Sequence, residues 1–236
     1  MNLNASSQPG SLPGSQKDLL EKYVNAVLAA PASLGLTATR DPAEFWERHV
    51  LDALKLLTFL PKNLLDATLR VIDIGSGNGV PGIPIAIALP GWSVYLLDAS
   101  NKKTGFLDMF CKSNKIENAI VLPGRAEILG HHPKFRGQFD LAFSRALGKL
   151  PTALELSVPF LKRDGLLIIP HGYTYQTELL RSQRALNELG AALQDSKPYS
   201  LNKIVNYTAL TFLKINDTPE TYPRKVGTPT KRPLLG

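Results

Sequence analysis

Hydrophobic and polar positions alternate along this chain in segments that predict strands and helices in turn. Short apolar runs bounded by turn residues predict strands, and longer segments with apolar positions three and four apart predict helices. The expected strands are 70–74, 93–98, 119–122, 138–144, 166–170, 200–205 and 207–215, and the expected helices between them are 82–89, 101–114, 150–161 and 175–189. Such alternation is typical of a mostly parallel sheet covered on both faces. The last two strands leave no room for a crossover helix, so we expect them to pair antiparallel.

Two further helices are expected before the first strand. Residues 16–30 place apolar side chains on one face and end at Pro31, which cannot continue a helix. The run Asp41-Pro42-Ala43-Glu44 is a helix start, with a capping aspartate, a proline in the first turn and a glutamate positioned to close a capping box. That helix is expected to run to Phe59. We therefore divide the chain into a disordered lead at 1–15, an N-terminal helical extension at 16–62, an α/β domain at 63–216 and a tail at 217–236.

The tail has a composition of its own. Residues 221–236 contain four basic side chains, three prolines and no acidic residue, so a regular element is not expected there. One interpretation is a flexible end that adds solubility. The other is an ordered basic strap that contacts phosphates, which we favour because proline lowers the cost of ordering a segment.

A glycine-rich turn follows the first strand of the α/β region. The turn Gly75-Ser76-Gly77-Asn78-Gly79 lies between a strand and a helix, where a ligand can contact the backbone at the carboxyl edge of a parallel sheet. Val80 stands where a dinucleotide fingerprint requires its third glycine, and Asp73 would repel a pyrophosphate. Both features favour a cationic or neutral nucleoside ligand. S-adenosylmethionine, with its ammonium and sulfonium groups, fits this description. The alternative interpretation is that the glycines form a tight structural turn that binds no ligand.

The ends of the later strands carry further candidate ligand contacts. Asp98 ends the second strand, where a carboxylate accepts hydrogen bonds from ribose hydroxyls. A backbone amide at Ala126-Glu127, after the third strand, is placed to bond an adenine ring. The fourth strand ends in Ser144-Arg145-Ala146 and lacks the Asn/Asp-Pro-Pro-aromatic turn typical of enzymes that methylate exocyclic amines. We expect Arg145 to bind phosphate, the cofactor or a base edge.

Composition restricts the partner and the compartment. A chain of 236 residues with 44% hydrophobic residues is long enough for one large domain, and its net charge of +7 suits an anionic partner such as nucleic acid. The single cysteine, Cys111, excludes a disulfide framework and a cysteine-rich zinc site. His131 and His132 have no carboxylate or cysteine partner, so no metal is expected. Without a leader or a membrane-spanning run, we expect a cytoplasmic protein.

Several motifs occur together in an order that resembles one protein family. They are Leu36-Thr-Ala-Thr-Arg-Asp-Pro42, Arg48-His-Val-Leu-Asp52, Asp73-Ile-Gly-Ser-Gly-Asn-Gly-Val-Pro-Gly-Ile-Pro84, Leu97-Asp98, Gly124-Arg-Ala-Glu127, Ser144-Arg-Ala146 and Tyr222-Pro-Arg-Lys-Val-Gly-Thr-Pro-Thr-Lys231. From residue 16 to the end, the chain resembles the bacterial small-subunit rRNA guanine-N7 methyltransferases, also called glucose-inhibited division protein B. It departs from the common family pattern at Gly35, where members often have Asn, and at His171-Gly172, where many have Lys-Gly.

The resemblance implies a fold, a reaction and a set of partners. The fold would be a Rossmann-like class I S-adenosylmethionine-dependent methyltransferase, with a seven-stranded mostly parallel sheet and an N-terminal helical extension. The reaction would be N7-methylation of a guanine in 16S rRNA near the decoding centre, with the small ribosomal subunit or its precursor as partner and neither metal nor membrane. The rival interpretations are a small-molecule methyltransferase and a non-catalytic RNA-binding module on the same fold.

The residues and the resemblance together give the expected site. Expected cofactor contacts are Asp73, Gly75, Gly77, Gly79, Val80, Asp98, Ala99, Ala126, Glu127 and Arg145, of which Gly75, Val80, Asp98, Ala126, Glu127 and Arg145 match the family's cofactor positions. Expected catalytic residues are Arg145, His49 and Asp52, the last as a carboxylate near the positive charge of the methylated base. Expected RNA contacts are Arg48, Lys134, Arg136, His171, Arg224, Lys225, Lys231 and Arg232.

Overall fold

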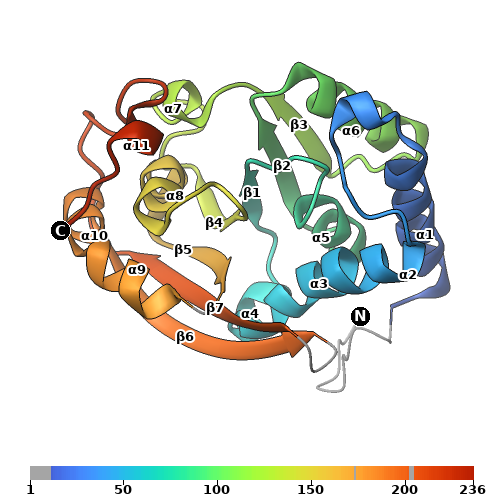
Figure 1. The fold of residues 1–236 in the computed structure, drawn as a ribbon, viewed down its shortest axis with the longest axis horizontal. Coiled ribbons are helices and arrows are strands. Elements are labelled where there is room, and N and C mark those ends of the chain that lie inside the picture. The colour runs from blue at the N-terminus through green and yellow to red at the C-terminus, as the bar shows by residue number, and fades with distance from the viewer. Residues whose placement is uncertain (1–11, 173, 202–204) are drawn as a thin grey trace.

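The computed structural model describes residues 12–172, 174–201 and 205–236, which form one α/β body (Figure 1). Its sheet has seven strands in the order β3-β2-β1-β4-β5-β7-β6. The strands are β1 (Arg70–Ile74), β2 (Ser93–Asp98), β3 (Ala119–Pro123), β4 (Phe139–Ser144), β5 (Leu161–His171), β6 (Ala191–Leu201) and β7 (Val205–Lys214). The first five strands are parallel, and β7 is antiparallel to both β5 and β6. This topology confirms the Rossmann-like class I methyltransferase fold.

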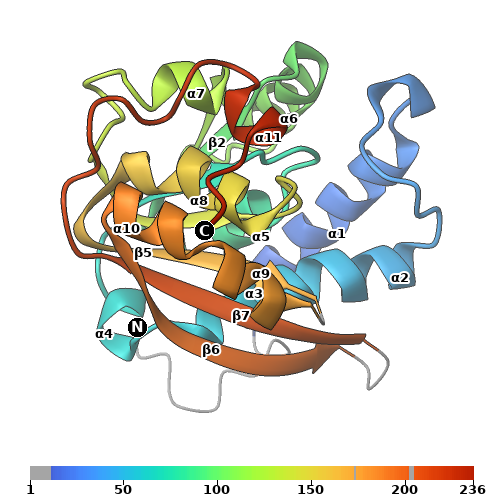
Figure 2. The same ribbon diagram turned by 60° about the vertical axis from the view of Figure 1, so that its left-hand side comes forward.

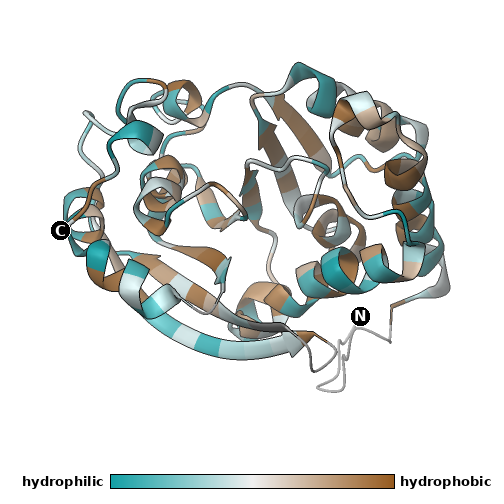
Figure 3. Cartoon of the chain, viewed as in Figure 1, coloured by the Kyte–Doolittle hydropathy of each residue, from teal (hydrophilic) through white to brown (hydrophobic). Residues whose placement is uncertain are grey.

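Helices cover both faces of the sheet. One face carries α1 (Gly14–Ala29), α5 (Gly82–Ala88) and α6 (Asn101–Ser113), and the other carries α8 (Leu150–Ser157), α9 (Tyr175–Arg181) and α10 (Gln183–Leu189). Along β1, Val71 belongs to the first core, whereas Ile72 and Ile74 belong to the second. Successive side chains of a strand point to opposite faces, so a central strand buried on both sides reads as one apolar run. Figure 3 shows the brown, hydrophobic colour of these central strands.

The N-terminal extension lies along the α5 side. Its second helix lies between two short turns in the chain. A 3-10 turn at Ala32–Leu34 precedes it, and the short helix α4 (Lys62–Leu65) follows it. The second helix starts as predicted, with Asp41 accepting a hydrogen bond of 2.8 Å from the Ala43 amide. Its course is α2 (Pro42–Phe45), a π-helical segment (Trp46–Leu51), α3 (Asp52–Leu56) and a 3-10 turn (Leu57–Phe59). π-Helical turns are rare and frequently lie at functional sites, and this one carries Arg48 and His49.

Predicted boundaries differ from the structure in the second half of the chain, most of all in three elements. Of the strand expected at 200–205, residues 202–204 lie outside the described residues, and the strand that ends at Leu201 starts much earlier, at Ala191, directly after the left-handed Gly190 that ends α10. The expected helix at 175–189 is interrupted at Ser182. The expected strand at 166–170 is longer, because β5 begins at Leu161, directly after a 3-10 turn at Val158–Phe160. For the two strands, pairing with neighbouring strands determines boundaries that local periodicity does not show.

The chain ends also differ from expectation. Residues 1–11 of the predicted disordered lead lie outside the described residues, and α1 begins inside that lead at Gly14. The tail contains a single helical turn, α11 (Thr228–Lys231), although no regular element was expected there. Its second residue, Pro229, suits the first turn of a helix, where the missing amide has no partner to lose. Figure 2 shows the tail passing α7 (Ala126–Leu129) and returning to place α11 beside α8.

Candidate active site

The register of the sheet brings three strand ends to one place. Ile74, the last residue of β1, pairs with Leu97 of β2 on one side and with Ser144 of β4 on the other. Asp98 and Arg145 each follow directly, so they lie on either side of the glycine turn that leaves β1. The carboxyl edge of a parallel sheet is the general ligand position of such folds.

The glycine turn is fixed by bonds to neighbouring backbone and to Asp98. The amides of Gly75 and Ser76 donate to the Leu97 carbonyl at 2.8 and 2.9 Å. Gly77 donates to Oδ2 of Asp98 at 2.8 Å, and the other oxygen of that carboxylate accepts from the Ser100 amide at 2.8 Å. A carboxylate offers about four acceptor positions, so Asp98 retains capacity for the hydroxyls of a ligand.

Two glycines of this region are required by close packing. A Cβ atom at Gly75, whose φ is 75°, would lie 2.4 Å from Cδ2 of Leu147. A Cβ atom at Gly82, in the first turn of α5, would lie 2.2 Å from Cδ2 of Leu96. Gly75 therefore packs closely against the loop that follows β4, and the first turn of α5 packs closely against β2.

Asp73 lies beneath the turn. It is 1% exposed, and its Oδ2 accepts a hydrogen bond of 3.0 Å from the Gly82 amide at the start of α5. Burial raises the pKa of this carboxyl to about 7. We therefore interpret Asp73 as a group that holds α5 against β1, rather than as the direct cofactor contact that we expected.

Arg145 is paired with a carboxylate that a second distant segment also contacts. Its Nη2 lies 3.0 Å from Oδ2 of Asp52 in α3, and Oδ1 of Asp52 accepts a hydrogen bond of 2.8 Å from the hydroxyl of Tyr199 in β6. Asp52 is 1% exposed. Burial raises the pKa of its carboxyl, whereas the charge of Arg145 and, to a smaller extent, the hydrogen bond from Tyr199 lower that pKa. Tyr199 was missed by sequence reasoning, because no local spacing connects it to Asp52, 147 residues away.

His49 lies in the same region. Its ring packs on Phe45, with 4.5 Å between ring centroids. Burial lowers the pKa of His49 to about 4, and the positive charges of Arg145 and Arg48 add to this. The imidazole is therefore neutral at pH 7 and is poorly suited to act as a general acid there. The structure thus brings together the three residues expected to be catalytic.

Three buried polar atoms at this edge have no hydrogen-bond partner among the described residues. They are Oγ of Ser76, Oγ of Ser144 and Nη1 of Arg145, from the ends of β1 and β4; a fourth such atom, Oγ of Ser157, lies in α8. Buried polar atoms are bonded in the great majority of cases, so such a cluster calls for a ligand. The partly exposed backbone of the turn, the free acceptor capacity of Asp98 and the Ser76 hydroxyl together fit a nucleoside with hydroxyl and ammonium groups.

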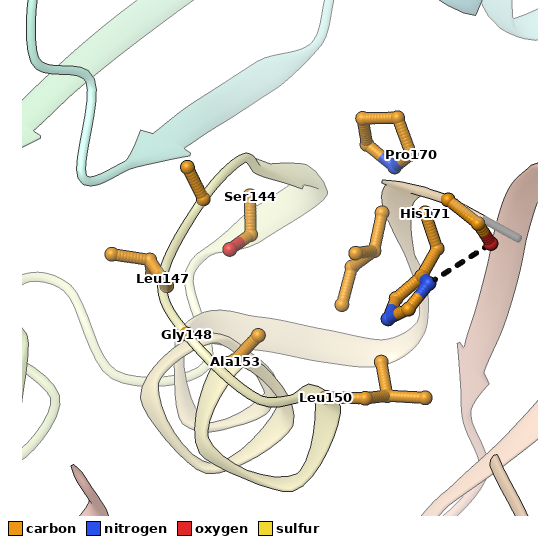
Figure 4. Close-up of a pocket in the computed structure, with 10 residues that line it drawn as sticks. Ser144, Leu147, Gly148, Leu150, Ala153, Pro170 and His171 are labelled. Carbon is orange, nitrogen blue, oxygen red and sulfur yellow. Dashed lines mark hydrogen bonds between the residues drawn. The ribbon is translucent and has the colours of Figure 1, made fainter. Parts of the chain in front are cut away.

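A separate pocket of about 180 Å³ opens between the ends of β4 and β5 (Figure 4). Ser144, the loop after it, the start of α8 and His171 line this pocket. Ala146 in that loop has a φ of 55°, a strained conformation for a residue other than glycine and one that concentrates at functional sites. Nε2 of His171 lies 3.3 Å from Oε2 of Glu178, which also accepts a hydrogen bond of 2.8 Å from the Leu150 amide.

Residues 16–203 match the model of the family described as rRNA small subunit methyltransferase G. The chain is 35% identical over 221 residues to the ribosomal RNA small subunit methyltransferase G of Nostoc punctiforme, which covers 93% of this chain and 91% of the relative. It is 36% identical over 225 residues to that of Desulfitobacterium hafniense, with coverage of 95% and 92%. The chain belongs to the rRNA small subunit methyltransferase G family.

Solved structures share the fold of this family member at low sequence identity. TYW2 of M. jannaschii in complex with AdoMet is 17% identical, with a TM-score of 0.52 and coverage of 71% of this chain and 76% of that one. TrmN of Thermus thermophilus is 21% identical, with a TM-score of 0.50 and coverage of 70% and 49%. Among the described residues, no helix is long and apolar enough to cross a membrane. The same part of the chain holds no group of three or more His, Cys, Asp or Glu side chains that could bind a metal.

In this methyltransferase G family member, Glu127 and Arg224 fasten the tail to the body. Oε1 of Glu127, which follows β3, accepts a hydrogen bond of 2.9 Å from the Gly227 amide. The guanidinium of Arg224 donates two hydrogen bonds to the fully buried carboxylate of Glu155 in α8, at 2.8 Å from Nε and 2.6 Å from Nη2. Both contacts were missed in the sequence, since Glu155 reads there as one polar position of an ordinary helix.

The residues expected to contact RNA fall into two groups. Arg224 is engaged with Glu155, and the guanidinium of Arg136 donates to the carbonyls of Gly130, Tyr222, Thr218 and Pro219 at 2.9, 2.7, 2.6 and 3.0 Å. These two arginines hold the tail, so we exclude them from the expected RNA surface. The exposed side chains that remain are Lys134, Lys225, Lys231, Arg232 and Arg48, the last paired with Glu44 at 2.7 Å. His171 lines the pocket between β4 and β5.

Proposed function

We propose that this protein transfers the methyl group of S-adenosylmethionine to N7 of a guanine in 16S rRNA near the decoding centre. One observation carries the proposal. In a member of an rRNA methyltransferase family, Arg145 lies beside the glycine turn, is paired with the buried carboxylate of Asp52, and has one guanidinium nitrogen, Nη1, without a partner among the described residues. The cofactor class and the guanine are inferred from the site chemistry and from the resemblance described above.

The glycine turn and Asp98 would hold the cofactor. Asp98 would accept hydrogen bonds from the ribose hydroxyls while its present bond to Gly77 keeps the turn in place. The segment at Ala126 and Glu127, buried beneath the tail, would border the adenine. When bound, S-adenosylmethionine supplies an electrophilic methyl group on a sulfonium.

No general base is required for this reaction. Guanine N7 carries a free lone pair at neutral pH, so the bond from N7 to carbon forms as the bond from sulfur to carbon breaks, and the sulfur keeps the electron pair. The protein contributes alignment, exclusion of water and electrostatics. A neutral His49 beside Arg145 is consistent with this, because neither side chain has to accept a proton at pH 7.

Asp52 takes a different role from the one expected. Its carboxylate is buried and already engaged by Arg145 and Tyr199. We therefore propose that Asp52 positions Arg145, whose unpartnered Nη1 would bind a phosphate or base edge of the substrate. Arginine suits both partners, since its planar fork binds phosphate oxygens and base acceptors.

The target base would enter the pocket between β4 and β5. RNA bases are reached in unpaired segments and are recognised by their edges, while lysine and arginine hold the backbone. The unpartnered Ser144 hydroxyl and the His171 ring line a space on the scale of a single nucleobase. Lys134, Lys225, Lys231 and Arg232 would contact phosphates around it.

The test is methylation of small ribosomal subunits from a strain lacking this gene, followed by nucleoside mass spectrometry and mapping of N7-methylguanosine in 16S rRNA. We expect one modified guanine with the wild-type protein and loss of the product with Asp98→Ala and Arg145→Ala, both checked for folding. A small-molecule methyltransferase would bind S-adenosylmethionine and leave the rRNA unmodified. A non-catalytic RNA-binding module would bind the particle and transfer no methyl group.

A further inference from the structure

One residue of the N-terminal extension reaches the glycine turn directly. The hydroxyl of Tyr23, in α1, donates a hydrogen bond of 2.8 Å to the backbone carbonyl of Asn78, 55 residues away. Tyr23 is fully buried, and its hydroxyl would lie 3.3 Å from a Cβ atom placed on Gly79. The helix thus contacts the turn at Asn78.

The turn needs restraint at this point. Asn78 lies between Gly77 and Gly79, whose φ angles of 55° and 104° are accessible to glycine without a side chain to hold them. The Gly77 amide donates to Asp98. The Gly79 amide, which belongs to the same peptide group as the Asn78 carbonyl, donates to the Ser76 carbonyl at 2.6 Å. That peptide group is thus held at its N–H by the turn itself and at its carbonyl by Tyr23, which is the one donor to this carbonyl among the described bonds.

The position of the Tyr23 hydroxyl is itself set by packing. The ring makes edge contacts with Phe45 of α2 and Phe110 of α6, at centroid distances of 6.2 and 5.5 Å. Three helices therefore place the donor, and the ring has little freedom to turn away. Burial also raises the pKa of Tyr23 well above its usual value, so the hydroxyl stays protonated as a donor.

We infer that Tyr23 is a positioning residue for cofactor binding, which holds the Asn78 peptide so that the turn is ordered before the ligand arrives. The inference rests on the proposed function, because the turn is taken as the S-adenosylmethionine site. A turn with three glycines is costly to order on binding, and a fixed contact made in the free protein removes part of that cost. The N-terminal extension then belongs to the cofactor site and does more than cover the sheet.

The experiment compares Tyr23→Phe with Val27→Ala. Phenylalanine keeps the ring packing and removes only the hydroxyl, whereas Val27, buried one helical turn further along α1, makes no polar contact. Calorimetry with S-adenosylmethionine and with S-adenosylhomocysteine gives Kd for each folded variant. We expect Tyr23→Phe to raise Kd by about two-fold to ten-fold, the range for one lost neutral hydrogen bond. Val27→Ala should lower the stability and leave Kd at the wild-type value.

A second measurement uses the protein without ligand. Hydrogen exchange of the amides at 77–79 should be faster in Tyr23→Phe than in wild type, and unchanged in Val27→Ala after correction for global stability. The KM for the RNA substrate should stay constant in both variants. Wild-type Kd and wild-type exchange in Tyr23→Phe would overturn the inference, as would an equal rise of Kd in Val27→Ala. A wild-type protein that does not bind S-adenosylmethionine would instead overturn the proposed function itself.

Discussion

Asp52 and Arg145 form an ion pair, with 3.0 Å between Oδ2 and Nη2, that joins the N-terminal extension to the end of β4. The side chain of Asp52 is 2% exposed, and the side chain of Arg145 is 21% exposed. The pair therefore connects a segment outside the α/β domain to the proposed reaction centre, and its loss should affect both stability and turnover.

Replacing Asp52 with Asn tests this connection. The amide keeps the shape and removes the charge, which leaves Arg145 without its counter-ion. Breaking a buried pair costs about 3–5 kcal/mol, and the partial exposure of Arg145 should reduce this to about 2–3 kcal/mol. Urea denaturation measures the loss, and single-turnover methylation scaled to folded protein should fall as well. Tyr199→Phe, which leaves the ion pair intact, should show a smaller loss in both measurements; an Asp52→Asn variant with wild-type turnover would contradict the positioning role.

His49 should make stability depend on pH in the acid range. Its folded pKa of about 4 lies below the usual value of 6.5, so the unfolded chain binds a proton first as the pH falls. Stability from this group is complete above about pH 6.5 and is lost as the pH falls toward 4. Because the ring is partly exposed, we expect a loss of about 1 kcal/mol between pH 7 and pH 5.

The measurement is the free energy of unfolding at pH 7 and pH 5 for wild type and His49→Gln. Asp73 acts in the opposite direction, since its raised folded pKa of about 7 adds stability as the pH falls below that value. Both proteins contain Asp73, so the difference between them isolates His49. An equal pH dependence in the two proteins would show that His49 titrates normally.

The tail should separate into residues that hold it and residues that bind RNA. Arg224→Ala removes the counter-ion and both side-chain bonds of the fully buried Glu155 and leaves it the bond from the backbone amide of residue 224, so the substitution should cost about 3 kcal/mol of unfolding free energy. Lys225→Ala, on an exposed neighbour, should change stability by less than about 0.5 kcal/mol. In RNA binding at several salt concentrations, Lys225→Ala and Lys231→Ala should each lower the salt slope by about 1. Unchanged slopes in both lysine variants would remove the tail from the proposed RNA surface.

Two glycine-to-alanine substitutions should have opposite effects. Gly75→Ala places a methyl group against Leu147 at a φ of 75°, which should destabilise the protein by about 2 kcal/mol or more and prevent cofactor binding. Gly105 lies in the interior of α6 with nothing within 4 Å of the added carbon, so Gly105→Ala should stabilise by about 0.5–1 kcal/mol. Thermal unfolding measures both, and the α6 variant should retain wild-type cofactor affinity.

The sequence was sufficient for features that depend on neighbours along the chain. The period of two in strands and of about 3.6 in helices identified β1 to β4 and the helices α5 and α6, because burial of one face leaves a repeating pattern. The glycine turn and the acid that ends β2 were recognisable for the same reason, since chain order alone places them at the carboxyl edge of a parallel sheet. The family motifs were likewise read from short runs of residues adjacent in the chain.

The tertiary structure alone decided contacts between residues far apart in the chain. The polar edge strand β6, largely teal in Figure 3, has no clear alternation, and its bounds follow from antiparallel pairing with β7. Arg224 looked like a phosphate ligand until Glu155, 69 residues earlier, proved to be buried beneath it. Tyr199 and Tyr23 likewise acquired their roles only when packing placed their hydroxyls within 2.8 Å of Asp52 and of the Asn78 carbonyl. Such pairings follow from how the elements pack, and a local pattern carries no record of which distant residue will lie opposite.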